Sequence, residues 1–515
     1  MAVGLLAYYF SATDLSRLSP ALEYLRQYEY IQGKAQQCSA IRATTRGKLS
    51  VITRYTDLYE TEQLGYWSTF QANVTPSCFV RPASAEQVSY ALAISEFTQC
   101  PFAVKSGGHA PFAGASNILG GMTIDLRLLN EISINDHKNV TRIGPGNHWI
   151  DVYENLTPRN LSVVGGRVTG IGVGGLVLGG GISFFSGRYG WACDGVVNYQ
   201  VVFADRSIRD VNLTSYPDLY WALRGGGNNF GIVTRLDLET FPQGGMWGGQ
   251  IYWGAEYNQT VLEAFDHFAV ESPKDVDAAV YVGVVYVQPL GDFVTLGELV
   301  YARPEADPAI LQNFTCIPTT SSPIPTTLRH SNLTDLTQEI NRTSPDGLRE
   351  CFWTLTFRHS QEVMHRGLAI WVEEIQSIKN VSGLVPALVY QVININVLEK
   401  MKRNGGNCLG LQDEKEPLII VNLPVMWSDT LPKEIDDQIL ATFERVVDRI
   451  HEYAQSVGRD HPFIYQNYAG DAPNQNVFAG YGAENLDRLQ QISAKYDANC
   501  VFQKLQPGYF KVSRA

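Results

Sequence analysis

The stretch VKSGGH at residues 104–109, together with GGRVTGIGVGGLVLGGG at residues 165–181, decides the fold of this chain. The second stretch holds nine glycines in 17 residues, and Val, Ile and Leu alternate with them, which is not typical of linkers. Glycine among apolar residues lets the backbone take positive φ or approach a flat, charged ligand closely. Consecutive N–H groups can surround a pyrophosphate without a basic cluster. We therefore expect a dinucleotide between two small subdomains.

Residues 170–175, GIGVGG, also satisfy the G-x-G-x-x-G pattern of Rossmann folds. That pattern requires a strand before it and a helix after it. We expect no helix here, because three glycines follow at 179–181 and each disfavours a helix by about 1 kcal/mol. Regular alternation of strands and helices is also missing around the motif. The sequence therefore argues against a Rossmann site.

The composition is that of a large globular protein. The 515 residues are 45% hydrophobic and 18% charged, which suits two or three domains and not disorder. The net charge of −12 argues against a nucleic-acid partner, which would need a basic surface. No apolar run approaches the roughly 18 residues of a membrane span, so we expect no membrane partner. We also expect no metal site.

The sequence favours the secretory pathway, although its start does not. Eight cysteines fit disulfides in an oxidising compartment; Cys316 and Cys351 could form one pair, but sequence does not determine connectivity. Residues 2–10 are apolar but lack a basic region and a clear cleavage site, so either the start is incomplete or the protein is not secreted. Ten Asn-x-Ser/Thr sequons fit a glycoprotein, unless Asn and Thr are merely frequent: Asn73, Asn139, Asn155, Asn160, Asn212, Asn258, Asn313, Asn332, Asn341 and Asn380.

Strand and helix patterns indicate an α+β fold. A capping pair, Ser84 and Gln87, begins a helix that continues to about residue 97. Later helices are expected at 217–224, 361–379, 433–457 and 484–497. Strands are expected at 78–82, 102–104, 122–126, 140–143, 196–203, 208–211, 230–241, 279–287 and 293–301.

Residues 105–109, KSGGH, resemble the R/K-S-G-G-H loop of the vanillyl-alcohol-oxidase-type flavoproteins, and most closely the berberine-bridge-enzyme-like branch. The resemblance covers residues from about 75 to 505. In its detailed sequence pattern the chain is most similar to fungal members, many of which act in secondary metabolism. The other segments that match this branch, in order, are 174–181, 189–190, 193–194, 222–231 (ALRGGGNNFG), 465–468 (YQNY) and 496–502.

The resemblance implies a two-subdomain PCMH-type FAD-binding domain and a substrate domain with an antiparallel sheet backed by helices. We expect residues 1–71 to form a lead-in to the FAD domain and 72–245 its main part. Residues 246–460 would be the substrate domain, and 461–515 a C-terminal segment that returns to the FAD domain. We expect a monomer.

By resemblance, His109 carries the flavin on its 8α-methyl carbon. Many members add a cysteine bonded to flavin C6, and Val168 stands at that position, so FAD should be monocovalent through His109. Cys193 belongs to another motif and is expected to be a buried free thiol or structural. The cofactor-binding residues implied are Lys105, Ser106, Gly107, Gly108, His109, Pro145, Gly146, Gly166, Val168, Thr169, Gly172, Gly174, Gly175, Gly179, Gly180, Val196, Ile232, Val233 and Asn467.

The YQNY segment resembles a strand that faces the flavin ring. Tyr468 is our first candidate for the catalytic base and Tyr465 the second; the alternative is that both only pack on the ring. Tyrosine has an ordinary pKa near 10, so a base of this kind needs a neighbouring cation. Gln391, Asn394 and Trp427 could line the pocket.

These observations predict an FAD-dependent oxidoreductase. It would transfer hydride from a small organic substrate (an alcohol, sugar, amine or secondary metabolite) to flavin N5, and oxygen or another acceptor would reoxidise the flavin. Some family members close rings after hydride loss, so the product could be cyclised. By resemblance, Ile171 stands where family members have a small or branched residue near the face from which oxygen approaches the flavin, and this leaves the choice between oxidase and dehydrogenase open. The alternatives are a secreted glycoprotein with this fold but no redox turnover, and a flavoprotein whose flavin only supports a cyclisation.

Overall fold

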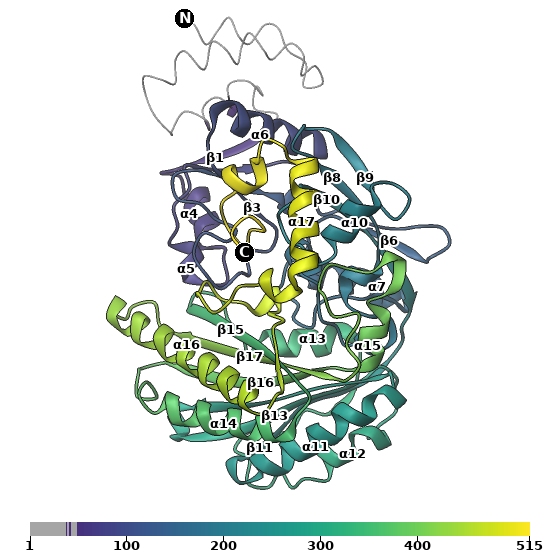
Figure 1. Ribbon diagram of the computed structural model, residues 1–515, viewed down its shortest axis with the longest axis vertical. Coiled ribbons are helices and arrows are strands. Elements are labelled where there is room, and N and C mark those ends of the chain that lie inside the picture. Colours follow the sequence, from purple (N-terminus) through teal and green to yellow (C-terminus); the bar gives the residue numbers. More distant parts are fainter. Residues whose placement is uncertain (1–37, 39–40, 43–48) are drawn as a thin grey trace, which may run out of the picture.

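The computed structural model describes residues 38, 41–42 and 49–515. Two small sheets form one half of the molecule and one large sheet forms the other (Figure 1). The predictions for the apolar start at 2–10, and for most of the lead-in, lie outside the described residues. The predicted boundary at 245 lies in the short link between the two halves.

The first small sheet carries the first glycine stretch at the end of a strand. Its order is β1-β2-β4-β3, with β1 antiparallel to β2 and the other pairs parallel. Helix α6 (Ala85–Thr98) is capped by Ser84, as predicted, while the Gln87 side chain accepts from the Ala83 N–H and not from the Ser84 N–H that a capping box would use. The strands are β1 (Ser50–Thr53), β2 (Cys78–Arg81), β3 (Phe102–Lys105) and β4 (Met122–Asp125).

The second small sheet has the order β5-β6-β10-β8-β9, with β7 paired to β10. The predicted hairpin after residue 196 is confirmed as β8 and β9. Helices α7 (Trp149–Leu156) and α10 (Pro217–Leu223) belong to this half. The strands are β5 (Ile132–Ile134), β6 (Val140–Ile143), β7 (Leu161–Val163), β8 (Val196–Val202), β9 (Ile208–Val211) and β10 (Ile232–Pro242).

The large sheet has eight strands in the order β14-β11-β13-β12-β16-β17-β15-β18, and every pair is antiparallel. Helices α11 (Asn258–Glu271), α14 (Gln361–Ile375) and α16 (Lys433–Ser456) lie on its outer side (Figure 1). The strands are β11 (Met246–Gly254), β12 (Ala278–Val287), β13 (Asp292–Tyr301), β14 (Arg329–Ser331), β15 (Arg349–Arg358), β16 (Val385–Ile393), β17 (Leu418–Trp427) and β18 (Asp460–His461).

Alternation along each strand divides the faces of this sheet. On β15, Trp353, Leu355 and Phe357 join the hydrophobic core that α14 and α16 cover. Their neighbours Phe352 and Thr354 point to the other face, since successive side chains alternate. Helix α13 (Leu333–Asn341) lies on that inner side and contacts both β11 and α7. The inner face is therefore the one that meets the FAD-binding half.

After α16 the chain returns to the first half. Helix α17 (Ala483–Tyr496) packs beside α10, and Lys495 pairs with Asp218. Figure 1 shows this last part, in yellow, against the upper half of the molecule. The YQNY segment lies on the way back, so it is held between the two halves.

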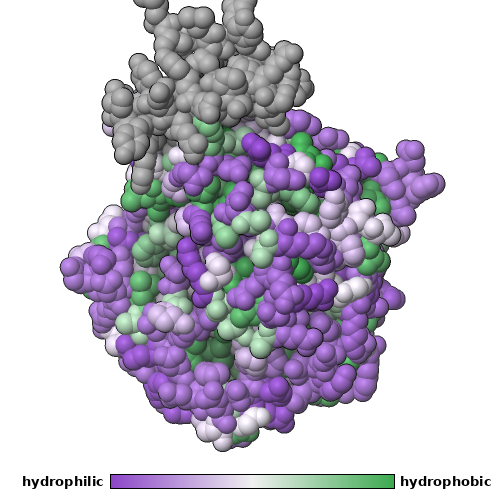
Figure 2. Space-filling model, turned by 45° about the horizontal axis from the view of Figure 1, so that its top comes forward, coloured by the Kyte–Doolittle hydropathy of each residue, from purple (hydrophilic) through white to green (hydrophobic). Residues whose placement is uncertain are grey.

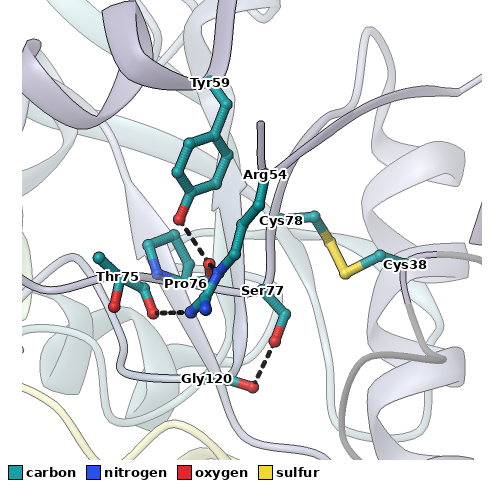
Figure 3. The surroundings of a disulfide bond; sticks show 8 residues. All are labelled: Cys38, Arg54, Tyr59, Thr75, Pro76, Ser77, Cys78 and Gly120. Atoms are coloured by element: carbon teal, nitrogen blue, oxygen red, sulfur yellow. Dashed lines mark hydrogen bonds between the residues drawn. A yellow bond between two sulfur atoms is a disulfide. The ribbon is translucent and has the colours of Figure 1, made fainter. Parts of the chain in front are cut away.

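The cysteines correct one prediction. Cys38 and Cys78 form a disulfide beside the loop at 75–77 (Figure 3). The predicted pair Cys316–Cys351 is wrong, because Cys316 is exposed whereas Cys351 is buried with its thiol against the Pro111 carbonyl. Cys193 is a buried free thiol, one of the two states expected for it.

The expectation that no helix follows Gly172 is also wrong. Helix α8 (Val173–Leu178) begins directly after it and ends at Gly179. Val173 and Val177 are fully buried in the core, and this packing outweighs the cost of the two glycines inside the helix. The Rossmann fold is still excluded, because the strands on either side of α8 pair antiparallel with β10.

The sequon asparagines all reach the surface at least in part. Six of the sequon asparagines are exposed and the other four are half-buried. Asn341 is one of the half-buried four, and its side chain accepts from the Gly170 N–H. Figure 2 shows that hydrophilic residues cover most of the visible described surface. No helix in the described part of the chain has the length and apolar character needed to cross a membrane.

Candidate active site

The two glycine stretches touch each other through their backbones. A Cβ added to Gly107 would lie 2.5 Å from the backbone nitrogen of Gly172, and a Cβ on Gly172 would collide with Gly107 in return. Neither position therefore tolerates a side chain. This contact joins the end of β3 to the start of α8.

Ser106 fixes the junction. Its hydroxyl donates to the Pro145 carbonyl at 2.5 Å and accepts from the Gly174 N–H at 3.2 Å. Three separate segments therefore meet at one hydroxyl group. The result is a closely packed wall of backbone at the first turn of α8.

A cavity opens beside this wall. A Cβ on Gly175 would meet no atom within 4 Å, so this glycine faces open space. The buried Oε1 atom of Gln506, which also lines the cavity, has no hydrogen-bond partner. A bound dinucleotide would fill the space and satisfy this oxygen, so the residues fit FAD. The cavity is lined by Val104, Ser106, Leu126, Pro145, Gly174, Gly175, Leu178, Asn228, Gly231, Ile232, Val233 and Gln506.

Half of these lining residues were not predicted individually. Asn228 and Gly231 lie in the ALRGGGNNFG motif, so that motif could have indicated them. Gln506 belongs to the C-terminal segment, and no local pattern marks it. Its place in the cavity comes only from the return of the chain after α17.

The side chain of Lys105 lies away from the cavity. Its ammonium group donates to the Gly65 carbonyl at 2.7 Å and lies 3.9 Å from the centre of the Tyr66 ring. Burial lowers the pKa of Lys105 to about 8. The same ring and the Lys105 stem press on Gly108, which adopts φ +73°. Lys105 thus stabilises the loop from the side opposite the cavity.

His109 is half-buried and stacked on an aromatic ring. Its imidazole lies parallel to Trp67, with 4.1 Å between centroids and 10° between planes. Burial, with a smaller contribution from the nearby His148, lowers the pKa of His109 to about 4. The imidazole is therefore neutral at physiological pH, the form whose nitrogen can act as a nucleophile.

Val168 and Thr169 continue the second stretch beyond the cavity wall. Val168 is half-buried and packs on the hydrophobic core, and Thr169 is buried with its carbonyl accepting from the Ile150 N–H. Val168 has no group that could bond a flavin. The free cysteines of the described chain all lie outside residues 165–181.

Two more glycines of the predicted set are required by protein packing. A side chain on Gly166 would collide with Trp149, and one on Gly180 with Trp191. Gly180 also has φ +112°, which disfavours other residues. These glycines shape the segment, and neither lines the cavity.

Val196 and Gly146 are also held by contacts within the protein and lie outside the cavity lining. Val196 is buried at the start of β8, where its carbonyl accepts from the Tyr220 hydroxyl at 2.5 Å. A side chain on Gly146 would collide with the Leu126 carbonyl. Neither residue is among those that line the cavity.

Tyr465 anchors the end of the glycine segment. Its hydroxyl oxygen accepts from the backbone N–H groups of Gly181 and Ile182, each at 3.1 Å, and from the Asn467 amide at 3.0 Å. Asn467 also packs directly on Gly179. Burial raises the pKa of Tyr465 well above its ordinary value. These contacts hold the end of the glycine segment in place.

Tyr468 has the cation that a tyrosine base requires. Its hydroxyl oxygen accepts from the Arg167 guanidinium at 2.7 Å and lies 3.2 Å from the Gln391 amide. The ring stands edge-on to Phe352 and is half-buried. Arg167 was not predicted, although it directly precedes Val168 in the second glycine stretch.

Of the three residues suggested for the pocket, only Gln391 reaches this tyrosine. Asn394 caps helix α15 (Ile395–Lys400) and donates to Ser272. The Trp427 indole donates to Asp436 on the outer side of the sheet. The polar groups of Asn394 and Trp427 are therefore bound to other residues of the protein and do not contact Tyr468.

Comparison with known proteins agrees with this geometry. Residues 76–212 match a family model described as an FAD binding domain. The chain is 37% identical over 462 residues to the FAD-dependent monooxygenase FUP4 of Fusarium proliferatum (strain ET1), covering 87% of each chain. It is 38% identical over 459 residues to the FAD-dependent monooxygenase tpcD of Cochliobolus heterostrophus, again covering 87% of each.

Solved structures share the fold at lower identity. The BBE-like 1 protein of Physcomitrella patens superposes with a TM-score of 0.72 at 18% identity, over 91% of this chain and 97% of that one. A glucooligosaccharide oxidase of Acremonium strictum, whose FAD is described as 6-S-cysteinyl and 8α-N1-histidyl, gives 0.70 at 19% identity, over 92% and 98%. The predicted α+β architecture is confirmed.

Proposed function

Because this chain belongs to the FAD-linked oxidoreductases of the vanillyl-alcohol-oxidase type, in the berberine-bridge-enzyme-like branch with fungal FAD-dependent monooxygenases, we propose how its own residues hold the cofactor and move a proton. FAD binding and oxidoreductase activity are properties of this family. The covalent link, the base and the substrate are our proposals.

The glycine wall and cavity hold FAD, and His109 is the residue that bonds it. The neutral imidazole and its stacking on Trp67 support this role, because the nucleophilic nitrogen is available and the ring is oriented. Val168 occupies the place of the second, cysteinyl link. The link through His109 is therefore the only one.

Tyr468 is the catalytic base. Its contact with Arg167 is the observation that carries this assignment, since the guanidinium stabilises the phenolate oxygen that accepts a proton. When bound, FAD supplies the hydride acceptor, which oxygen or another acceptor restores. Tyr468 takes the proton from a substrate O–H or N–H group as the C–H bond is broken. Asn467 and Tyr465 keep the glycine segment in place.

The substrate is a small organic molecule from the classes of alcohols, sugars, amines or secondary metabolites, and its product could be cyclised. One chain contains both the cavity and the tyrosines, so a monomer suffices. The exposed sequon asparagines fit the secretory pathway. Oxidase or dehydrogenase activity depends on the acceptor.

Anaerobic reduction of bound flavin, followed by stopped-flow absorbance, tests the base. Tyr468→Phe keeps the ring and removes the hydroxyl, and should slow reduction about 10²-fold or more. Phe352→Leu keeps the Tyr468 hydroxyl and alters the packing of this side chain on the Tyr468 and Trp67 rings, so it is the matched control and should have a much smaller effect. An unchanged rate in Tyr468→Phe would remove it from the mechanism.

A further inference from the structure

Arg167 is a cation without an acidic partner. It is half-buried, donates to the Gln391 carbonyl oxygen at 2.6 Å and to Tyr468, and lies 5.1 Å from the centre of the Tyr281 ring. Within the described residues, no carboxylate forms an ion pair with it. A cation that is removed from water loses hydration, and a carboxylate partner would compensate this cost.

Glu298 is the complementary case. It is 1% exposed, and neither of its carboxylate oxygens makes a hydrogen bond of good geometry, although the Gln250 side chain lies close enough to act on its charged form. Burial and the charge of Glu339 raise its pKa to about 8, so it is mostly protonated at neutral pH. A buried carboxyl group whose oxygens lack well-formed hydrogen bonds is destabilising unless a ligand completes its contacts.

Strand pairing brings the two groups to one place. Glu298 on β13 pairs with Gln250 on β11 and with Tyr281 on β12, and Tyr281 pairs with Gln391 on β16. These four side chains form a polar row across adjacent strands. The alternating neighbours Val280, Val282 and Leu299 join the outer core, so the row is on the inner face.

Arg167 and Tyr468 lie against one end of this row. Arg167, Tyr281 and Tyr468 each keep part of their surface exposed, whereas Glu298 lies deeper. Charge from Arg167 acts on Glu298, yet the two form no ion pair. The row therefore places a cation that has no carboxylate partner near a buried carboxyl group, and the two are not paired with each other.

We propose that Arg167 and Glu298 form a binding site for an acidic oxygen of the substrate: a carboxylate, a phenol or an enolised dicarbonyl group. This inference rests on the proposed function, whose substrate class it narrows. The guanidinium compensates the negative charge, and the carboxyl O–H donates to a second oxygen. A neutral sugar would offer Arg167 no negative charge beyond that of the Tyr468 oxygen, and an ammonium group would be repelled by it.

The test uses the FAD-loaded protein and a defined probe, 4-hydroxy-6-methyl-2-pyrone, which is an enolic acid. Titration calorimetry should give saturable binding of the pyrone and none of cellobiose or benzylamine at the same concentrations. Arg167→Met should weaken pyrone binding about tenfold or more. Arg342→Met removes an exposed cation of the same region and should leave the dissociation constant unchanged.

The role of Glu298 has its own readout. Around it lie Arg167, Glu339 of α13, Arg329 of β14, and the phenols of Tyr281 and Tyr252. Pyrone binding should weaken as pH rises through about 8, because Glu298 loses its donor proton and gains charge. Glu298→Gln should keep binding and flatten this pH dependence.

Tighter binding of cellobiose or benzylamine than of the pyrone would overturn the proposal, as would Arg167→Met with an unchanged dissociation constant. These results would leave the proposed function standing, because calorimetry does not depend on turnover. Failure of every substrate to reduce the flavin would instead contradict the proposed function.

Discussion

The hydroxyl oxygen of Tyr468 lies 2.7 Å from the guanidinium of Arg167, although 301 residues separate the two in the chain. One comes from the second glycine stretch and the other from the segment that returns after α16. The contact exists only because the C-terminal part of the chain lies back against the FAD-binding half. It joins the cofactor wall to the inner face of the large sheet.

Replacing Arg167 should therefore slow chemistry without removing the cofactor. In Arg167→Met, the phenolate oxygen loses a charge-assisted hydrogen bond, which is worth about 1.5–3 kcal/mol. Flavin reduction should fall about tenfold or more, and the flavin content should stay near that of the unchanged protein. Arg167→Lys should recover part of the rate. A full rate in Arg167→Met would show that Tyr468 acts without this cation.

Gly175→Leu should abolish FAD binding and spare the fold. Gly175 faces open space, so the leucine side chain would occupy the cavity without colliding with protein. Gly244→Leu is the matched control, since Gly244 also has no neighbour within 4 Å but is exposed on the surface. Flavin absorbance per chain measures both. Equal flavin content in the two variants would place the cofactor elsewhere.

Tyr465→Phe should behave as a structural change. It leaves the N–H groups of Gly181 and Ile182 without their acceptor, at about 1–3 kcal/mol for each unsatisfied donor. The midpoint of thermal unfolding should fall. Flavin that remains bound should still be reduced, at a rate far above that of Tyr468→Phe. If the two phenylalanine variants lost reduction equally, the division into anchor and base would be wrong.

Covalent attachment of FAD should tolerate acid. The pKa of His109 lies near 4, below the ordinary 6.5, so its reactive neutral form persists as pH falls from 8 to about 5. The rate at which apoprotein takes up flavin covalently should stay level over this range and fall only towards pH 4. A decline centred near 6.5 would indicate an exposed histidine. The same shift favours unfolding in acid, because the unfolded state binds the extra proton.

The features that depend on local sequence pattern could be predicted. Both glycine stretches, most strands and the capped helix at Ser84 follow from composition and spacing within a few residues. Helix α8 was missed because tertiary packing of Val173 and Val177 overrides the cost of its glycines. The wrong pairing of Cys316 with Cys351 had no geometric basis in the chain.

The parts of the site that escaped prediction depend on long-range pairing. Gln506 reaches the cavity only through the returning C-terminal segment. Glu298 and Tyr281 look like ordinary strand residues until β12 and β13 pair in register. A role for Arg167 becomes evident only from its contact with Tyr468.

The most direct measurement is the mass of the denatured protein. After acid precipitation, the purified protein should be yellow and carry the mass of one FAD, and peptide mapping should locate it on His109 alone. His109→Ala should lose this mass and keep at most non-covalent flavin. A covalent flavin in His109→Ala, a second attachment site, or a colourless protein with its histidine intact would contradict the account.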